Sequence, residues 1–372
     1  MKKILDFLTG KRPAIQHATQ SPVSVAAAGL PQDRVVAFIA DWHRQWEKAS
    51  AMMGRKVDFK VWHELVEQVD SAHFLEGRTC GSSGHFGSHP DFAPDTTTID
   101  GCEIDGDLAQ VFTTKTAPPM THYNVYDLQR DAGGSWRIAR IFDLLHPPAQ
   151  MLIASSTLHQ RMADASGDAP LIAPGEELQL DENRLFLGDR SVQTDSVSGS
   201  ITVQELGRLT VSSGALAITD FGYDLADVQP LHRSAPCGSH PVQIVHLDRR
   251  VAGVRVRFKE GATAASWKAA NTVQGNGVYG VDAGNLSIFD MAALDGMSRI
   301  AYERAFQQWS GSGTPALLSL KSPNDCLITS SGYGDGAYPA FWGLAADGTI
   351  VSLYIDFLVL AEESAEGVLT SL

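Results

Sequence analysis

The chain has 372 residues, and 44% of them are hydrophobic, which is enough for two domains that each bury a core of their own. No stretch approaches the ~20 consecutive apolar residues of a membrane-spanning helix. Asp6 interrupts the short apolar block near the start, which makes a poor signal peptide. The four cysteines form no Cys-x-x-Cys pair, a pattern typical of a reducing compartment. We therefore expect a cytoplasmic protein that does not associate with membranes.

The net charge of −14 is unevenly distributed along the chain. Residues 1–150 carry 15 Lys and Arg against 18 Asp and Glu, whereas residues 151–372 carry 14 against 25. An acidic excess repels nucleic acid and attracts a basic partner. Solubility explains the same excess equally well. The composition therefore predicts no nucleic-acid binding and favours a basic protein as the partner, if there is one.

Two amphipathic helices are predicted after a lead-in segment of residues 1–30. Residues 32–53 repeat apolar side chains, Trp42 and Trp46 among them, at spacings of three and four. Asp58 is a suitable N-cap for a second helix that reaches Ala72. The apolar stripes of both helices should face one common core.

The chain then changes to four β-rich segments with turn residues between them. The segments are 97–104, 109–116, 121–128 and 135–144. Helices followed by an antiparallel meander predict an α+β domain over residues 31–150, in which a curved sheet packs on the helices.

Residues 151–177 are predicted as a helix, over 149–163, and a linker that follows Pro147-Pro148. A second domain should occupy residues 178–372, with many short strands and few helices. Its first strands are predicted at 206–211, 216–219, 242–247 and 251–258, and its helices at 263–273 and 298–309. This pattern lacks the regular βαβ alternation of a doubly wound sheet and predicts a strand-rich α+β domain.

A glycine-rich hairpin organises the end of this domain. Strands are predicted at 326–330, 340–344 and 350–360, and Gly332, Gly334 and Gly336 surround Asp335 in the first connection. A phosphate-binding glycine loop leads from a strand into a helix, whereas this one leads into another strand. No cofactor is therefore predicted.

The first domain resembles the cone-shaped fold of nuclear-transport-factor-2-like proteins, in particular their bacterial immunity-protein branch. The resemblance covers residues 31–150. It is carried by the two helices, the long strands and the hairpin from Tyr123 to Leu144. Enzymes, transport factors and binding modules all use this fold, so the resemblance implies a fold more than an activity.

The second domain resembles a bacterial family known as domain of unknown function 4241, over most of residues 200–360. The residues that carry this resemblance are Ser213-Gly214 with Asp220, His240-Pro241-Val242, Gly280-Val281-Asp282 to Asp290, Gly332 to Pro339 and Ile355-Asp356-Phe357. Members of the family look like components of bacterial toxin and immunity loci. The resemblance therefore implies a role in such a locus.

Our first hypothesis is an immunity protein that binds a secreted antibacterial toxin and covers its active or substrate-binding site. Tyr333, Asp335, Tyr338 and Trp342 are the candidate contact residues, because the glycine loop would display them beside the sheet. A two-domain interaction scaffold is an alternative. No catalytic residue is assigned under either hypothesis.

A second alternative is a small-molecule enzyme, such as a hydrolase or a lyase. A cone pocket in the first domain would offer His43, Asp70, His73, Tyr123 and Asp143. The second domain would offer a carboxylate cluster of Asp220, Asp282, Asp290, Asp335 and Asp356. Aspartates at strand ends are more often turn residues, and the tryptophans near the pocket suggest a filled core.

Asp356 differs from the other aspartates because it lies inside an apolar run. A buried carboxylate needs a partner, and a glycine-loop amide, Arg255 or Arg257 could supply one.

Cys80, His85, His89 and Cys102 could together hold zinc. Their spacing is irregular, and a metal-free loop is the favoured interpretation.

Overall fold

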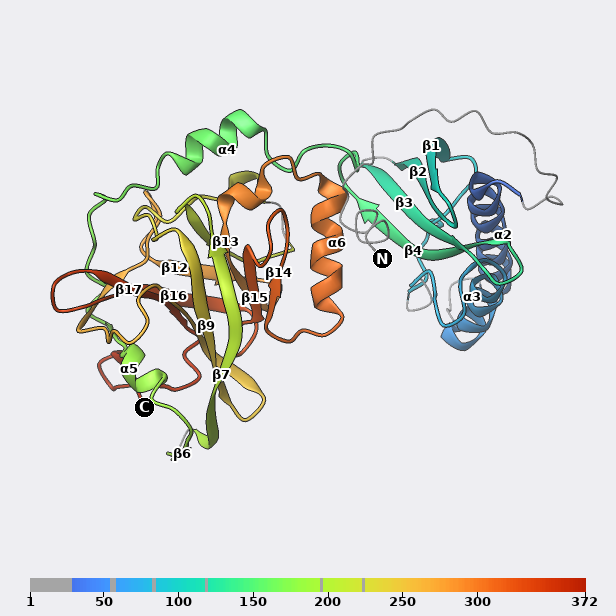
Figure 1. Cartoon of the computed structure of the whole chain (residues 1–372). Helices are drawn as coiled ribbons and strands as arrows, with labels where there is room; N and C mark the ends of the chain where they lie inside the picture. Colours follow the sequence, from blue (N-terminus) through green and yellow to red (C-terminus); the bar gives the residue numbers. More distant parts are fainter. Residues whose placement is uncertain (1–28, 54–57, 82–84, 118–119, 195–196, 223–224) are drawn as a thin grey trace. The chain divides into compact units, whose positions relative to one another are not determined.

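The computed structural model describes residues 29–53, 58–81, 85–117, 120–194, 197–222 and 225–372 (Figure 1). The predicted lead-in over residues 1–30 lies almost entirely outside the described residues. The chain divides between Gln150 and Met151 into two compact units. We call them the N-terminal unit and the C-terminal unit.

The N-terminal unit begins with two helices, α2 (Pro31–Met53) and α3 (Phe59–His73). The Oδ1 atom of Asp58 accepts hydrogen bonds from the backbone amides of Lys60, at 3.0 Å, and Val61, at 3.4 Å. This carboxylate caps α3 by satisfying two of its free N–H groups. Both helices therefore form where the apolar period and the capping residue predicted them.

A four-stranded antiparallel meander follows the helices, in the order β1-β2-β3-β4. Its strands are β1 (Thr97–Asp105), β2 (Leu108–Ala117), β3 (Met120–Arg130) and β4 (Trp136–Leu144). The core between sheet and helices is aromatic: Trp42 and Trp62 meet edge to face at 5.5 Å, and both are 1% exposed. Large aromatic side chains that bury this much area account for most of the packing energy of a small unit.

The described residues of the C-terminal unit form three sheets. The largest has the order β11-β16-β17-β10-β9-β7-β6, and β12 also pairs with β16. Its strands are β6 (Arg190–Gln193), β7 (Ser198–Val211), β9 (Gly238–Leu247), β10 (Arg250–Arg257), β11 (Ser266–Ala269), β12 (Val278–Val281), β16 (Gly336–Leu344) and β17 (Ile350–Asp356). The second sheet has the order β14-β15-β13-β8. Its strands are β14 (Ala316–Leu318), β15 (Cys326–Ser330), β13 (Asn285–Asp290) and β8 (Leu216–Thr219).

Shorter elements complete this unit. The third sheet consists of β18 (Ala361–Glu363), β19 (Leu369–Ser371) and β5 (Leu178–Gln179). The helices are α4 (Ser155–Met162), α5 (Glu182–Leu185), α6 (Arg299–Ser310) and the 3-10 turns η2 (Leu225–Asp227) and η3 (Met291–Leu294). The chain thus mixes helices with a larger share of strands, as predicted.

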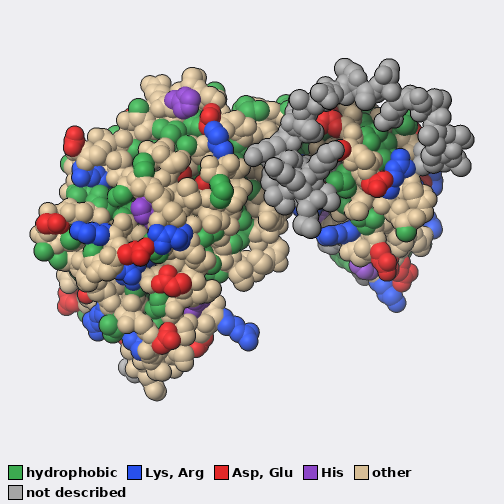
Figure 2. All heavy atoms as spheres, viewed as in Figure 1, with side chains coloured by type: hydrophobic (Ala, Val, Ile, Leu, Met, Phe, Trp, Pro, Cys, Tyr) green, Lys and Arg blue, Asp and Glu red, His purple; other side chains and the backbone are tan. Residues whose placement is uncertain are grey.

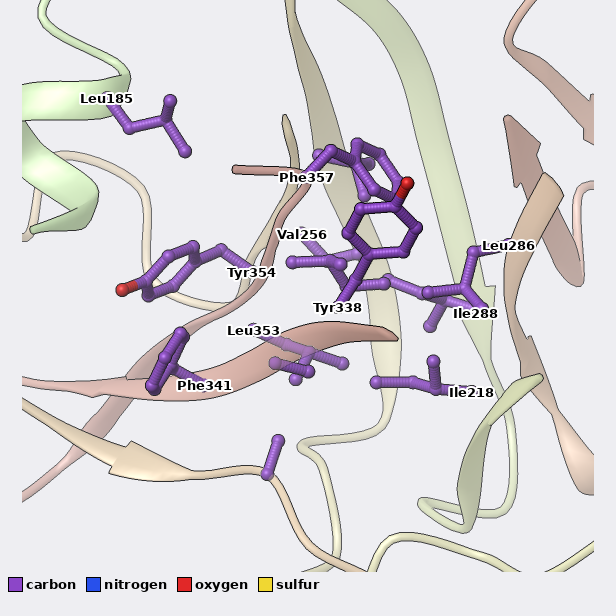
Figure 3. Packing of buried hydrophobic residues seen from close by; sticks show 14 of the residues in the cluster. Leu185, Ile218, Val256, Leu286, Ile288, Tyr338, Phe341, Leu353, Tyr354 and Phe357 are labelled. Atoms are coloured by element: carbon purple, nitrogen blue, oxygen red, sulfur yellow. The ribbon is translucent and has the colours of Figure 1, made fainter. Parts of the chain in front are cut away.

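The core of the C-terminal unit lies between the two larger sheets, which pack face to face. Leu353 from β17 and Val256 from β10 point towards Ile218 and Ile288 of the second sheet (Figure 3). Successive side chains of a strand point to opposite faces, so Tyr354 lies on the other face of the large sheet. A further apolar cluster fills the other side of the second sheet and includes residues of α4 and α6.

Two predicted elements of this unit are wrong. The helix predicted over residues 263–273 is replaced by the short strand β11, because Trp267 and Ala269 pair with Gly343 and Phe341 of β16. The strand predicted to reach Leu360 ends at Asp356. Leu358 has a φ of 59°, and its backbone amide donates to Oδ1 of Asp356 at 2.8 Å, which turns the chain out of the sheet.

Candidate functional site

The connection between β15 and β16 is a tight, internally bonded loop. The amide of Gly334 donates to the carbonyl of Ser331 at 2.7 Å, and the Ser331 hydroxyl donates to the carbonyl of Gly334 at 2.9 Å. Gly332 has a φ of 52°, and a Cβ there would lie 2.7 Å from the Cβ of Phe357. Only glycine combines this backbone conformation with so close an approach. The loop is therefore held in one shape before any partner binds.

Tyr333 projects from this loop and is 60% exposed. The guanidinium of Arg250 lies 4.5 Å from the centre of its ring, and Nη1 of the same arginine donates to the carbonyl of Gly332 at 3.1 Å. A cation over an aromatic face restricts the ring without covering its other side. Tyr333 is thus an exposed aromatic side chain in a fixed position.

Two exposed carboxylates lie in this loop and in the connection that it contacts. Asp335 is exposed in the same loop, and Asp282 is exposed in the connection between β12 and β13. The two connections meet, because the amide of Ser331 donates to the carbonyl of Gly284 at 3.1 Å. We call Tyr333, Asp335, Asp282 and Arg250 the loop tip.

Tyr338 and Trp342, two of the predicted contact residues, are not on the surface. Tyr338 is 4% exposed, and its hydroxyl donates to the carbonyl of Gly334 at 2.9 Å, so it supports the loop from below. Trp342 is fully buried in β16. Alternation along this strand places both side chains in the protein interior. The prediction that they contact a partner is therefore corrected, whereas Tyr333 and Asp335 remain accessible.

Asp220 lies next to the loop tip but is engaged in the fold. Its Oδ2 accepts from the amides of Asp282 and Ala283, both at 2.6 Å, and its Oδ1 accepts from the side-chain amide of Asn285 at 2.9 Å. Burial raises the pKa of Asp220, the two amides lower it, and the nearby charges of Asp282 and Asp335 raise it. This carboxylate fixes the connection that carries Asp282.

Asp290 has a similar structural role elsewhere in the unit. It is 1% exposed and accepts from the amide of Ser213 at 2.7 Å, the hydroxyl of Ser212 at 2.9 Å and the amide of Ala292 at 2.9 Å. The amide of Ser212 and the hydroxyl of Ser213 also donate to it. These bonds occupy both oxygens, which leaves little capacity for general acid or base work.

Asp356 is fully buried, and among the described residues neither the glycine loop nor an arginine pairs with it. Oδ1 accepts from Leu358, whereas Oδ2 has no hydrogen-bond partner among the described residues. Burial raises its pKa to about 7, and the Leu358 amide lowers it only in part. The five predicted aspartates therefore do not converge as one catalytic cluster.

Arg255 pairs instead with Glu182, a residue that the sequence analysis missed. Nη1 of Arg255 lies 3.0 Å from Oε1 of Glu182, and Oε2 of Glu182 accepts from the hydroxyl of Ser352 at 2.6 Å. The guanidinium also donates through Nε to Gln243 at 2.9 Å and stacks on Phe186 at 4.2 Å. No local pattern around Glu182 indicates a partner 73 residues away in the chain.

The five predicted pocket residues of the N-terminal unit do not form one site. His73 is 3% exposed, and its Nε2 lies 2.9 Å from Oδ2 of Asp41. Asp143 instead lies 3.1 Å from Nδ1 of His122, on the strands.

The remaining three predicted pocket residues come from α2, β3 and α3. His43 stacks on Trp46 in α2, and Tyr123 is half-buried in β3. Asp70 of α3 lines a cavity.

No three His, Cys, Asp or Glu side chains are grouped closely enough to hold a metal ion in the part of the chain that the structure describes. Cys80, His85, His89 and Cys102 all lie in that part. His85 is paired with Asp91, at 3.0 Å. The alternative of a zinc site thus finds no support in the geometry.

The comparisons with known proteins identify one region. Residues 209–355, from the end of β7 to β17, match a family described as a protein of unknown function (DUF4241). The resemblance predicted for the second domain is confirmed for this region, which contains the loop tip. No curated protein and no solved structure matches the chain, so the likeness of the first domain to nuclear-transport-factor-2-like proteins stays a prediction. Within the described residues, no helix is sufficiently long and apolar to cross a membrane.

Proposed function

We propose that this protein is an immunity protein that binds a basic toxin through the loop tip and covers its active or substrate-binding site. The observation that carries the proposal is the exposed ring of Tyr333, which Arg250 holds in place in the same loop as exposed Asp335. Tyrosine is enriched among the residues that dominate binding energy at protein interfaces.

The rigidity of the loop supports a binding role. Its internal hydrogen bonds and the contact of Gly332 with Phe357 fix its shape in the free protein. A partner that meets a preformed loop loses less conformational entropy on association. Buried Tyr338 contributes to binding indirectly, because its hydroxyl supports Gly334.

The local charge supports a basic partner. Asp335 and Asp282 are exposed, and Asp220 adds a third carboxylate behind them, whereas Arg250 is engaged with Tyr333. Acidic and basic side chains are interspersed on the face of the C-terminal unit that Figure 2 shows. The contact should therefore depend on these few residues more than on a long-range field.

We propose a toxin as the partner because the two domains resemble families that look like components of toxin and immunity loci. The test is to express the chain with the product of the neighbouring gene, in a catalytically inactive form, and to measure binding by calorimetry. Tyr333→Ala should weaken the complex by about 2 kcal/mol, or roughly 30-fold. Asp335→Lys should weaken it most at low salt, because added salt screens the charge of Asp335.

Two matched variants control for the loss of a side chain and the reversal of a charge. Leu187 is 70% exposed in the same unit, and Glu366 is an exposed carboxylate of another turn. Leu187→Ala and Glu366→Lys should leave the affinity unchanged. Absence of any complex with the neighbouring gene product, or equal losses in all four variants, would refute the proposal.

A further inference from the structure

The N-terminal unit contains a cavity of about 630 Å³ that lies outside its aromatic core. It is lined by His63, Glu67 and Asp70 of α3, by Phe74, which follows α3, and by Arg78 and Arg137. We call it the α3 cavity. Its volume is within the range of small-molecule sites.

One wall of the α3 cavity follows directly from helical geometry. His63, Glu67 and Asp70 are spaced by four and three residues and therefore share one face of α3, and Phe74 directly follows the helix. Phe74 is 3% exposed and supplies an apolar floor. Asp70 is 8% exposed, and its Oδ1 accepts from the amide of Cys80 at 3.0 Å, which fixes the carboxylate at the cavity wall.

Two further lining residues, Arg137 and Asp131, neutralise each other. Nε of Arg137 donates to Oδ2 of Asp131 at 3.0 Å, and the same guanidinium donates to the carbonyl of Ala72. The other oxygen of Asp131 accepts from the amides of Gly133 and Ser135, both at 2.9 Å. The charges of Arg137 and Asp131 thus cancel, so the net charge of the cavity depends on the other lining residues.

The remaining charges are predominantly negative. Glu67, Asp70 and Glu76 line the cavity, and Arg78 and His63 are the basic side chains beside them among the described lining residues, once the Arg137–Asp131 pair is set aside. Such a cavity repels anions and attracts a cation. The described residues offer no three-ligand group for a metal ion, so the carboxylates are better matched to an organic cation.

We propose that the α3 cavity binds a small organic amine, with the ammonium group between Glu67 and Asp70 and the apolar part on Phe74 and Leu75. This site is separate from the loop tip and does not depend on the proposed toxin binding. Burial raises the pKa of Asp70, and the hydrogen bonds from Cys80 and the charge of His63 offset this only in part. An ammonium group supplies the remaining compensation and forms charge-assisted hydrogen bonds.

The test compares three probes that share a phenylethyl body. Phenethylamine carries a cation, 2-phenylethanol is neutral, and phenylacetate is an anion. Ligand-observed NMR titrations of the full chain should show phenethylamine binding at least about tenfold more tightly than the alcohol, and no binding of phenylacetate. Equal affinities for the three probes, or preference for phenylacetate, would overturn the proposal.

Substitutions on α3 locate the bound probe. Glu67→Gln and Asp70→Asn should each weaken phenethylamine binding about tenfold. Glu64→Gln is the matched control, because Glu64 is exposed on the same helix but does not line the cavity. If Asp70→Asn fails to fold, Glu67→Gln alone tests the assignment, because Glu67 is exposed and its replacement should not affect folding. An unchanged affinity in Glu67→Gln, or an equal loss in Glu64→Gln, would refute the assignment.

Discussion

Buried ionisable side chains have different surroundings in the two units. In the N-terminal unit, His73 is held between two charged groups: Nε2 lies 2.9 Å from Asp41, and Nδ1 lies 3.4 Å from Nη1 of Arg34. Because arginine can only donate, Nδ1 is the acceptor and Nε2 carries the proton. In the C-terminal unit, Asp356 has a single amide partner for two oxygens.

The two groups should change stability in opposite directions as the pH falls from neutral. Burial lowers the pKa of His73, so the folded protein resists its protonation as the pH falls. Burial raises the pKa of Asp356, so the folded protein resists its ionisation as the pH rises. Burial thus makes the ionisation of His73 destabilising at low pH and that of Asp356 destabilising as the pH rises towards neutral.

The largest expected effect concerns Asp356. Its folded pKa of about 7 exceeds the unfolded value of 3.8, so the folded state binds more protons between these values and stability falls as the pH rises through them. Three pKa units correspond to about 4 kcal/mol. Relative to Asp356→Asn, the wild type should lose this amount between pH 4 and pH 8. The free energy of unfolding can be measured in urea at each pH, with hydrogen exchange in β17 as the probe. Parallel curves of this free energy against pH for the two proteins would contradict the prediction.

The Glu182–Arg255 pair gives the next largest effect. Both side chains lie on the same face of the large sheet as Asp356, but they compensate each other at 3.0 Å. Glu182→Gln should cost about 3 kcal/mol of unfolding free energy, because it leaves the guanidinium buried without its counter-charge. Replacing both residues, by Glu182→Leu with Arg255→Met, should cost less than the sum of the single changes. Glu176→Gln, at an exposed carboxylate, is the control and should change stability by less than about 0.5 kcal/mol.

The sequence predicts well those parts of the fold that depend on neighbours in the chain. The helical period that contains Trp42 and the cap at Asp58 are local signals, and α2 and α3 form where these signals place them. The segment around Trp267 contains a local helical signal too, yet it becomes β11 because pairing with β16 outweighs propensity. Local patterns cannot reveal such a distant partner.

The candidate sites show the same limit. The glycines around Asp335 indicate a tight loop, but the sequence does not distinguish exposed Tyr333 from buried Tyr338 five residues later. That difference arises from the strand register of β16. The sequence predicts Asp70 as a pocket residue. It does not predict that Arg137 lines the same cavity, because this depends on how β4 meets the end of α3.

A smaller effect is expected at His73. His73→Gln removes a hydrogen bond to a carboxylate and should cost about 1–2 kcal/mol at pH 7.5. The wild type alone should lose stability as the pH falls below the unfolded histidine value of 6.5, because its folded pKa is lowered. The gap between the two proteins should therefore narrow towards pH 5. Hydrogen exchange in α3 follows this unit alone, and a gap that widens on acidification would show that Asp41 outweighs burial.

The smallest effect, at Asp70, separates a residue kept for binding from one kept for stability. The substitution Asp70→Asn keeps a side-chain oxygen that can accept from the amide of Cys80, and it removes a charge whose pKa burial raises. This variant should therefore change the unfolding free energy by less than about 1 kcal/mol at pH 8, in the stabilising direction. A carboxylate that destabilises the folded protein and lines a cavity is expected where a bound ligand supplies the positive counter-charge. A clear loss of stability in α3, measured by hydrogen exchange, would instead assign Asp70 to the framework of the N-terminal unit.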